Sequence, residues 1–456
     1  MTFANDLRDF ATEGMQRLSV PGVAIGVLSP DCREVVPLGV TALETQFAVR
    51  PDSIFQIGSI SKPFTATLIM ALVEAGKLDL DAPITTYVPE LKLGAQRVVD
   101  TITLRHLLTH QAGFWGDWFE DFGLGDDAIE RFVGEYGRLP QLFEPGTLWA
   151  YNNCGYILAG LAAARAAGTT FEDALRAYVL DPLGLDHTFL SAADAIAYPV
   201  AVGHTNSADD GSAQIARQFL RPRARNPAGG VLASVEDILT FADLHLGRHF
   251  GVLAEASIAE MHRRQVATFE TGASWGLGFK IENANGSTLV GHGGATNGFR
   301  ADLQIVPSAG FAVAVLTNSD SGNRLASEVV GWVLDRRLGI THPEYATQEL
   351  AAGDAARYAG TYRQPYASIE ISAPDADLTV HITTHSPYSE NSEPQTSPEF
   401  GMRYIGDGRF VVTDGELQDS QVKFWENADG TIRFLQAGGR LYVPGRWEEL
   451  EGAQST

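Results

Sequence analysis

The chain has 456 residues, 45% of them hydrophobic, and a formal net charge of −23 at pH 7. This length suggests more than one domain, and the composition provides enough apolar residues for a large core. The acidic balance and the lack of a basic run argue against nucleic acid and anionic membrane surfaces as partners.

The N-terminal stretch predicts no export. MTFANDLRDFATEGMQRL carries acidic residues where a signal peptide needs a basic region followed by an apolar run. No stretch is long and apolar enough to span a bilayer. The two cysteines, Cys32 and Cys154, do not indicate a disulfide framework. We therefore expect a cytoplasmic protein.

Strand-like and helical patterns alternate over the first ~340 residues. PGVAIGVLSP and REVVPLGV favour a hairpin, and the segment after FQIG has apolar residues at helical spacing as far as Gly76. Later come an alanine-rich helix, NCGYILAGLAAARAAG, two strands in GFRADLQIVPSAGFAVAVLTNSD, and a closing helix. This order predicts an α/β (α+β) domain in which both chain ends join one central antiparallel sheet, beside a helical subdomain.

The pattern changes at about residue 350. Six short β-type segments follow, separated by turn signals such as Asp-Gly: YAGTYRQ, SIEIS, LTVHITT, RFVVT, QVKFWEN and TIRFLQA. They predict a C-terminal all-β domain, a small barrel, in which HSPYSENSEPQTSPEFG is a long loop. We place the two domains at residues 1–345 and 350–450.

Ser59 and Lys62 lie three positions apart in FQIGSISKPFTA, at the start of a predicted helix. Positions i and i+3 share a helix face, so the two side chains are neighbours. The helix N-terminus favours an oxyanion at Ser59 and, together with burial, lowers the pKa of Lys62. A shift of roughly 3 units from ~10.4, about 4 kcal/mol, would make the lysine a base near neutrality. A serine beside a neutral lysine is an activated nucleophile.

The same spacing occurs at Ser420 and Lys423, but within DSQVKFWEN, a predicted strand. Positions i and i+3 of a strand point to opposite faces, so this pair cannot cooperate. The helical context, rather than the spacing alone, marks Ser59 and Lys62 as catalytic candidates.

Two further stretches carry candidate residues. EPGTLWAYNNCGYILAG holds Tyr151 and Asn153 just before a helix, where a hydroxyl can relay a proton and an amide can hold a lysine or a substrate carbonyl. LVGHGGATNGFRADLQ holds His292, Gly293 and Gly294 before a strand, and glycines there let a substrate lie along the strand edge. Taken singly, the first stretch would indicate only a packed aromatic residue and a helix cap, and the second only a turn.

In this order the three stretches resemble one family, the penicillin-recognising serine enzymes: class C β-lactamases, D,D-peptidases and esterases, with their S-x-x-K, Y-x-N and K-T-G or H-x-G motifs. LLTHQAG, EPGTLWAYNN, DPLGLDHT and NPAGGVLASVEDI are also family-like, and the resemblance covers roughly residues 10 to 340. It implies a β-lactamase/transpeptidase-like fold.

The resemblance also implies a role for each residue. Ser59 is the acylated nucleophile, Lys62 its base, and Tyr151 the group that protonates the leaving group and activates the second nucleophile. Asn153 binds the substrate amide, and His292 takes the place of the third-motif lysine and hydrogen-bonds towards Tyr151. The N–H groups of Ser59 and Ala295, beside Gly293 and Gly294, form the oxyanion hole.

Histidine at position 292 departs from the β-lactamase pattern, because a neutral imidazole does not supply the standing charge of a lysine. The H-x-G form resembles the esterases, D-aminopeptidases and amidases of the group, and the thioesterases that release or cyclise nonribosomal peptides. The C-terminal domain resembles the lipocalin-like domain of some of these D-peptidases and thioesterases. A cytoplasmic substrate is thus implied: a small ester, a D-residue peptide or amide, or a carrier-bound peptide.

Other residues are weaker candidates. The aromatic loop could wall a pocket or simply pack; it comprises Phe114, Trp115, Trp118, Phe119 and Phe122. Four arginines before Asn226 could bind a carboxylate or a carrier phosphate, but a solvated loop is favoured for them: Arg217, Arg221, Arg223 and Arg225. Arg300 is the favoured carboxylate candidate, and Arg446 could reach the site only if the β domain folds over it. His106 and His110 have metal-pair spacing but no third ligand, so capping is expected and neither a metal nor a cofactor is predicted.

Three functions remain open. We favour a hydrolase working through an acyl-enzyme on a small ester or amide of a D-residue peptide. An acyltransferase or cyclase uses the same residues with an amine as acceptor, and a dry pocket would favour it. The third function is a non-catalytic module that merely becomes acylated.

Overall fold

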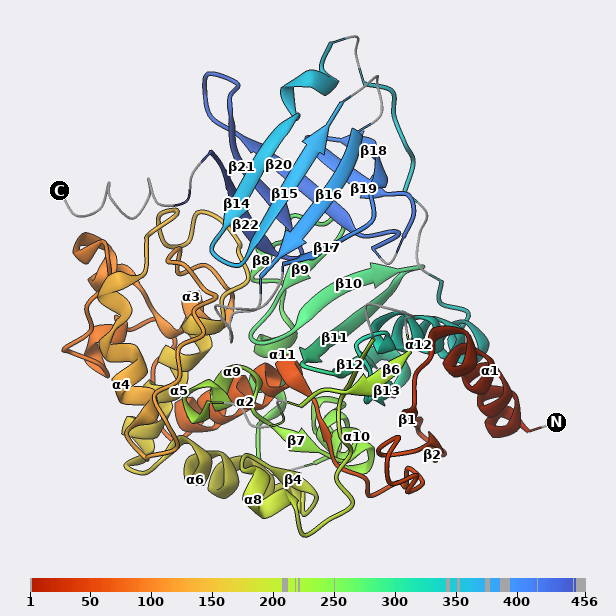
Figure 1. Cartoon of the computed structure of the whole chain (residues 1–456). Helices are drawn as coiled ribbons and strands as arrows, with labels where there is room; N and C mark the ends of the chain where they lie inside the picture. The colour runs from red at the N-terminus through yellow and green to blue at the C-terminus, as the bar shows by residue number, and fades with distance from the viewer. Residues whose placement is uncertain are drawn as a thin grey trace.

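The computed structural model describes residues 2–206, 212–217, 219, 222–249, 251–341, 345–350, 353–373, 378–385, 394–415, 417–445 and 447. An antiparallel sheet lies between two groups of helices, and a β-barrel sits across one end of that assembly (Figure 1). Among the described residues, no helix is both long enough and apolar enough to cross a bilayer.

The central sheet has eight strands in the order β2-β1-β13-β12-β11-β10-β9-β8, and its neighbours pair antiparallel. The bounds are β1 (Gly22–Leu28), β2 (Arg33–Gly39), β8 (Val266–Ala267), β9 (Ser274–Trp275), β10 (Lys280–Ala284), β11 (Ser287–Thr296), β12 (Phe299–Val306) and β13 (Phe311–Thr317). Because β1 pairs with β13, the expectation that both ends of the domain share one sheet is confirmed. β1 and β13 are buried along their whole length, as strands covered on both faces must be.

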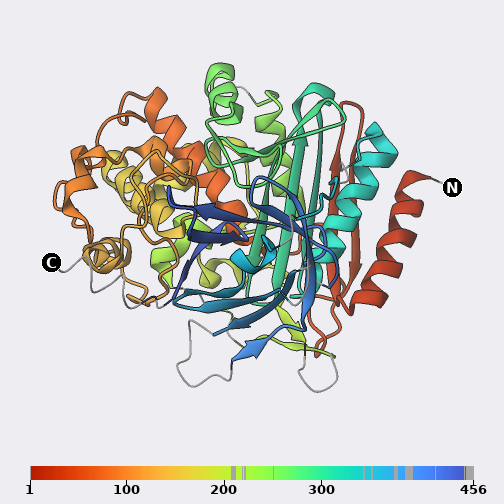
Figure 2. The ribbon, with the colours of Figure 1, turned by 90° about the horizontal axis from the view of Figure 1, so that it is seen from above.

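Helices cover both faces of this sheet (Figure 2). On one face, α1 (Phe3–Leu18) and α12 (Gly322–Leu338) pack together and share an apolar core with the strands. On the other, α10 (Val235–His245) contacts β1 and β13, and the helical subdomain follows beyond it. The sequence patterns predicted α12 but not α1.

The helical subdomain is built around α2 (Ser61–Glu74), which packs against α5 (Asn153–Ala167) and α9 (Asn226–Gly229). Nearly every residue of α2 is buried, which explains why its sequence is apolar all round rather than on one stripe. The other helices are α3 (Leu104–Leu108), α4 (Ala128–Gly134), α6 (Phe171–Leu175), α7 (Asp181–Leu183), α8 (Ala192–Ala195) and α11 (Glu255–His262). A small three-stranded sheet has the order β3 (Phe55–Gln56), β7 (Leu232–Ala233) and β4 (Thr188–Phe189). A two-stranded sheet pairs β5 (His204–Asn206) with β6 (Ala213–Ile215).

The C-terminal part is a closed antiparallel barrel of eight strands joined in chain order, with its own apolar core. The strands are β14 (Gly360–Gln364), β15 (Ala367–Ser372), β16 (Leu378–Thr384), β18 (Phe400–Gly406), β19 (Arg409–Val412), β20 (Gln421–Glu426), β21 (Ile432–Ala437) and β22 (Arg440–Pro444); β17 (Gln395–Thr396) adds to β16. The predicted barrel is confirmed. β18 and β22 were missed, and β17 and the start of β18 interrupt the predicted long loop, part of which lies outside the described residues. Lipocalins share this up-and-down topology, but a closer likeness to them stays a prediction.

The barrel packs directly on the first domain. The backbone N–H of Tyr151 donates to the Gly439 carbonyl at 2.9 Å, and the Gln436 side chain donates to the Trp149 carbonyl at 2.9 Å. The ring centroids of Trp115 and Trp447 are 4.6 Å apart. The hairpin between β21 and β22 therefore reaches the segment that carries Tyr151.

Candidate active site

Ser59 lies in a short 3-10 turn, Gly58–Ile60, that leads directly into α2. The preceding Gly58 has φ +53, a conformation that favours glycine, and a Cβ placed there would be 2.6 Å from the Ala295 nitrogen. The absence of a side chain at position 58 thus allows β11 to approach the serine closely. The structure brings Ser59 and the Ala295 N–H into one site.

Lys62 is fully buried one turn along the same helix. Its Nζ lies 3.1 Å from Ser59 Oγ, 2.6 Å from Asn153 Oδ1 and 2.7 Å from the Ala228 carbonyl oxygen. Burial, and then the positive charge of Arg440, hold the pKa of Lys62 well below its ordinary value, while Asp117 opposes this shift. The environment therefore favours the neutral amine.

A neutral lysine satisfies all three contacts in one arrangement. Both of its hydrogens are donated to fixed acceptors, the amide oxygen of Asn153 and the carbonyl of Ala228. The remaining lone pair then faces Ser59 and accepts the hydroxyl proton. The two acceptors thus direct the amine lone pair at the Ser59 hydroxyl.

Asn153 is oriented in turn by an ion pair. Its Nδ2 donates to Asp117 Oδ1 at 2.5 Å, and Asp117 Oδ2 accepts from Arg440 Nε at 2.9 Å. Burial raises the pKa of Asp117, but Arg440 and Asn153 outweigh that effect and hold it below its ordinary value. An ionised carboxylate only accepts hydrogen bonds, so it fixes the amide nitrogen of Asn153 on its own side and leaves the oxygen for Lys62.

Tyr151 lies between the serine, the lysine and the barrel. Burial raises the pKa of its hydroxyl, while Arg440 and a hydrogen bond with Ser59 work in the opposite direction. Lys62 Nζ is 4.7 Å from the ring centroid and the Arg440 guanidinium is 4.6 Å from it. The tyrosine is therefore held as a neutral phenol in contact with Ser59.

The imidazole ring of His110 packs against the ring of Tyr151. It is fully buried, its Nδ1 accepts from the Asn152 backbone N–H at 3.0 Å, and its ring centroid is 4.4 Å from that of Tyr151. Burial and the charge of Lys62 hold its pKa well below 6.5. The capping expected for this pair of histidines occurs only at His106, where Nδ1 accepts from the Thr103 N–H.

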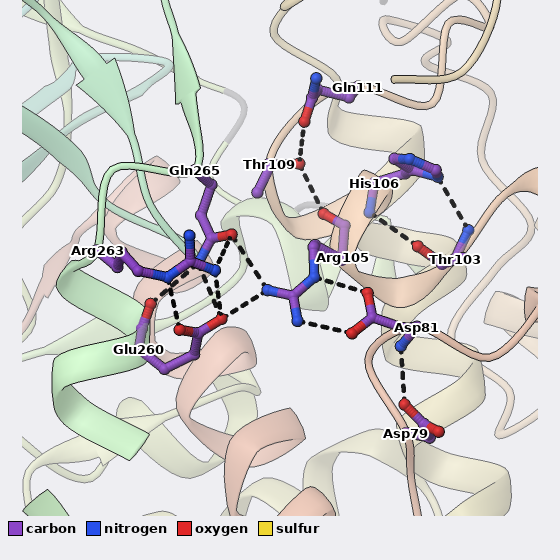
Figure 3. A network of polar contacts seen from close by, with 10 residues as sticks. All are labelled: Asp79, Asp81, Thr103, Arg105, His106, Thr109, Gln111, Glu260, Arg263 and Gln265. Carbon is purple, nitrogen blue, oxygen red and sulfur yellow. Dashed lines mark hydrogen bonds and ion pairs between the residues drawn. The ribbon is translucent and has the colours of Figure 1, made fainter. Parts of the chain in front are cut away.

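A surface network fixes the short helix α3 that precedes His110 (Figure 3). Arg105 binds both carboxylate oxygens of Asp81 at 2.7 Å and Glu260 of α11 at 2.7 Å. Thr109 donates back to the Arg105 carbonyl. The network joins α3 to two distant segments and so holds the loop that carries His110.

His292 departs from the expected arrangement in two respects. It lies inside β11 rather than in a turn before a strand. Its Nδ1 contacts the Gly293 carbonyl at 2.6 Å, and its Nε2 is buried without a hydrogen-bond partner among the described residues, so the implied bond to Tyr151 is not formed. Burial, and then Lys62, lower the pKa of His292 to about 3. The residue is a neutral imidazole, 6.1 Å from the Tyr151 ring between centroids.

The remaining residues of the third motif form one wall of the site. Gly293, Gly294 and Ala295 follow His292 along β11, and a Cβ at position 294 would lie 2.0 Å from the Ile57 carbonyl oxygen. Arg300 on β12 lies in the same wall, but its guanidinium is already paired with Asp320 at 2.8 Å and donates to two backbone carbonyls. A substrate carboxylate would have to share Arg300 with Asp320.

A cleft of about 1010 Å³ is lined by Ser59, Tyr151, Asn153 and His292, by Gly293, Gly294 and Ala295, and by Arg300. Aromatic side chains line part of it, namely Phe119, Trp149, Tyr151, Phe269 and Trp275. The barrel contributes the opposite wall through the turn at Gly438–Arg440 and through Thr384 and His385. The cleft is thus formed by both parts of the chain and is large enough for a peptide-sized ligand.

The other sequence candidates separate into those at the cleft and those away from it. From the aromatic loop, Phe119 lines the cleft, while Phe114 and Trp115 are core residues and Trp118 and Phe122 pack on Phe132. Arg225 is buried in the cleft wall with its guanidinium 4.0 Å from the Phe119 ring centroid, contrary to the expected solvated loop.

Two further arginines do not reach the cleft, and another two lie outside the described residues. Arg223 pairs with Asp126 and Glu172, and Arg217 is largely exposed near Glu44. Arg221 and Arg446 lie outside the described residues.

Sequence reasoning missed Asp117, Arg440 and the role of His110. Asp117 sits among the aromatic residues of FWGDWF, and an acidic residue in an apolar loop is a signal that could have been used. Arg440 had no such signal, since it follows two glycines in a hairpin. Within the described part of the chain, no three His, Cys, Asp or Glu side chains are grouped as a metal site would require.

The Beta-lactamase family pattern matches residues 7–337. This chain belongs to the beta-lactamase family. Penicillin-binding protein 4 of Amycolatopsis lactamdurans is 32% identical over 356 residues, which cover 76% of this chain and 93% of that protein. The unguisins hydrolase of Aspergillus violaceofuscus is 27% identical over 364 residues, covering 72% of this chain and 64% of that protein.

A solved structure matches both parts of the chain. The structure of SurE with D-Leu superposes with a TM-score of 0.76 at 26% identity, and the match covers 97% of this chain and 99% of SurE. The likeness therefore extends over the barrel as well as the sheet and helices. The family and the β-lactamase/transpeptidase-like fold are established, and with them a serine hydrolase in the broad sense.

Proposed function

We propose that this chain cleaves an ester or amide bond of a small D-residue-containing peptide through an acyl-enzyme at Ser59. The observation that carries the proposal is the buried Lys62, whose two fixed acceptors direct its lone pair at the serine hydroxyl. The substrate is a small molecule or a peptide, free or attached to a carrier protein, and we place the reaction in the cytoplasm.

Acylation follows from this geometry. Lys62 takes the proton of Ser59 as Oγ attacks the substrate carbonyl, and the oxygen that becomes negative is stabilised by the N–H groups of Ser59 and Ala295. Tyr151, in contact with Ser59, gives a proton to the leaving group. The leaving group departs and the acyl-enzyme remains.

Deacylation reverses these roles. Lys62 first passes the proton it took from Ser59 to Tyr151, so that both groups are neutral again. Lys62 then takes a proton from water through the Tyr151 hydroxyl, water attacks the acyl carbonyl, and Ser59 leaves with that proton. His292 stays neutral throughout, because its pKa is about 3, and acts by packing against the site.

The comparisons support a D-residue peptide as the substrate. One relative is named a hydrolase and a neighbouring structure holds the D-amino acid D-Leu. The cleft of about 1010 Å³ exceeds what a simple ester fills. The missing lysine of the third motif argues against efficient β-lactam hydrolysis.

A peptide cyclase, or acyltransferase, is the second candidate. The observation that favours it is the barrel wall of the cleft, where Gly438–Arg440 cover the site next to Tyr151. A covered, partly aromatic site would limit access of water and favour an amine of the substrate as the acceptor.

Intact-mass spectrometry tests the proposal. The protein is mixed briefly with a p-nitrophenyl ester, benzylpenicillin or a peptidyl thioester ending in a D residue, and Ser59→Ala is the control. We expect an adduct from the D-residue donor that is absent in the control, followed by release of linear peptide. Release of a cyclic peptide instead would identify a cyclase. A stable adduct without turnover would identify the acylatable binding module. No adduct with any donor would refute the proposal.

A further inference from the structure

The barrel reaches the catalytic lysine through an unbroken chain of polar contacts. Arg440, the first residue of β22, binds Asp117 at 2.9 Å; Asp117 accepts from Asn153; and Asn153 accepts from Lys62 at 2.6 Å. Arg440 and Asp117 are 323 residues apart in the chain. We call these four residues the Arg440–Lys62 relay.

We propose that Arg440 of the β-barrel is a positioning residue for Lys62, acting through Asp117 and Asn153, so that the barrel is part of the machinery that activates Ser59. The inference rests on the proposed function, because it concerns how the same nucleophile is activated. It assigns to the barrel a role in the chemical step, beyond its place in the wall of the cleft.

The orientation of the Asn153 amide decides whether Lys62 finds its acceptor. An amide offers oxygen on one side and nitrogen on the other, and Lys62 needs the oxygen. Asp117 selects that orientation only while it is an unprotonated acceptor with both oxygens in place. A buried carboxylate stays ionised if it is paired, and Arg440 is its cationic partner. Without Arg440, Asp117 can take up a proton or turn, and the amide of Asn153 can rotate.

The backbone around Arg440 is fixed to the same site. Gly439 accepts from the Tyr151 N–H, Gln436 donates to the Trp149 carbonyl, and the Arg440 Nη1 donates to the Gly438 carbonyl. The guanidinium is therefore held by the barrel hairpin and does not depend on a flexible surface side chain. Its planar group also covers the Tyr151 ring.

The relay has an electrostatic signature. The charged groups that act on Lys62 are Arg440 and Arg225, which lower its pKa, and Asp117, which raises it; burial contributes most. His110 and His292 also face it, and burial, the largest cause in each case, lowers the pKa of both and keeps them neutral. The reactivity of Ser59 falls at low pH as Lys62 becomes protonated, and we call this part of the pH profile the acid limb. Because removing Arg440 raises the pKa of Lys62, it should move the acid limb to higher pH. Removing the Asp117 charge should move it to lower pH, although both changes slow the reaction.

The test measures the rate at which an alkyl fluorophosphonate labels Ser59, followed by intact mass from pH 5 to 10 on the full chain. In this reaction Ser59 Oγ bonds to phosphorus, fluoride leaves and Lys62 receives the hydroxyl proton. The probe carries no carboxylate for Arg440 to bind, so the rate reports on the nucleophile. Arg433→Gln is the matched control, because Arg433 also bridges from β21 to the first domain, at the Leu142 carbonyl.

We expect Arg440→Gln and Asp117→Asn to lower the plateau rate by on the order of 100-fold, with acid limbs displaced in opposite directions. Arg440→Lys should restore the position of the limb and part of the rate, and Arg433→Gln should match the wild type. Cooperative thermal unfolding shows whether each variant is folded. If Arg440→Gln does not fold, the labelling rates of Asp117→Asn and Arg440→Lys decide whether the relay positions Lys62.

Two outcomes would overturn the inference. Labelling of Arg440→Gln at the rate and pH dependence of Arg433→Gln would refute the relay while leaving the serine hydrolase intact. Acid limbs that move the same way in both variants would indicate general loosening rather than positioning. No labelling of the wild type would refute the proposed function itself, and the relay with it.

Discussion

Replacing Gly58 with alanine would place a methyl group where the backbone of Ala295 already lies. The new Cβ would be 2.6 Å from the Ala295 nitrogen and 2.8 Å from its carbonyl oxygen. Ordinary contact begins at 3.4 Å, so β11 would have to retreat by about 0.8 Å. The alanine would also keep φ +53, which costs about 1–2 kcal/mol in a residue with a side chain.

The two effects have separate readouts. Strain lowers the free energy of unfolding by the same 1–2 kcal/mol, whereas retreat of the Ala295 N–H weakens the proposed oxyanion hole and lowers kcat/KM by roughly 100-fold. Gly76→Ala is the matched control, because Gly76 has φ +68 but no neighbour within 4 Å of a Cβ. It should lose stability alone.

The assay is kcat/KM for a p-nitrophenyl ester, with urea unfolding of the same samples. Retention of kcat/KM within about threefold of the wild type in Gly58→Ala would refute the reasoning, since it would mean that the Ala295 N–H does not need this position. Equal losses of activity in both variants would show that strain, and not the displacement of β11, is responsible.

Three further predictions concern residues around the site. His292→Gln should make the free energy of unfolding fall less steeply as the pH is lowered, by up to about 1.4 kcal/mol per pH unit between pH 6.5 and 3. The reason is that His292 takes up a proton in the unfolded chain but stays neutral in the folded one over this range. Urea unfolding from pH 4 to 7 measures the difference from the wild type. Tyr151→Phe should slow an amide donor by about 100-fold or more and a p-nitrophenyl ester far less, because p-nitrophenolate leaves without a proton; equal losses would contradict the assigned role. Arg105→Ala should lower the free energy of unfolding by about 1–2 kcal/mol, because it breaks the partly exposed ion pairs with Asp81 and Glu260. Thermal melts measure the loss. An unchanged melting temperature would mean that the network in Figure 3 contributes nothing to stability.

The sequence predicted most of the first domain because its elements carry local signals. The hairpin of β1 and β2, the buried helix α2 and the strands β12 and β13 all follow from apolar spacing and turn residues. The barrel was predicted from six of its strands, but β22 was missed, because RLYVP follows two glycines and contains an arginine and a proline. Helix α1 was not predicted either, although the residues that it buries, Leu7, Ala11 and Gly14, recur at helical spacing.

The sequence by itself determined that Ser59 and Lys62, the proposed nucleophile and its base, are neighbours, because they are one helical turn apart and the periodicity of the helix fixes their contact. Only the tertiary structure decided how that base is aimed. Asn153, Asp117 and Arg440 come from a helix start, a loop and a barrel strand, and no spacing within the chain relates them. Their contact exists because the barrel docks with the β21–β22 hairpin against Tyr151, and docking is set by packing and hydrogen bonds between surfaces distant in sequence.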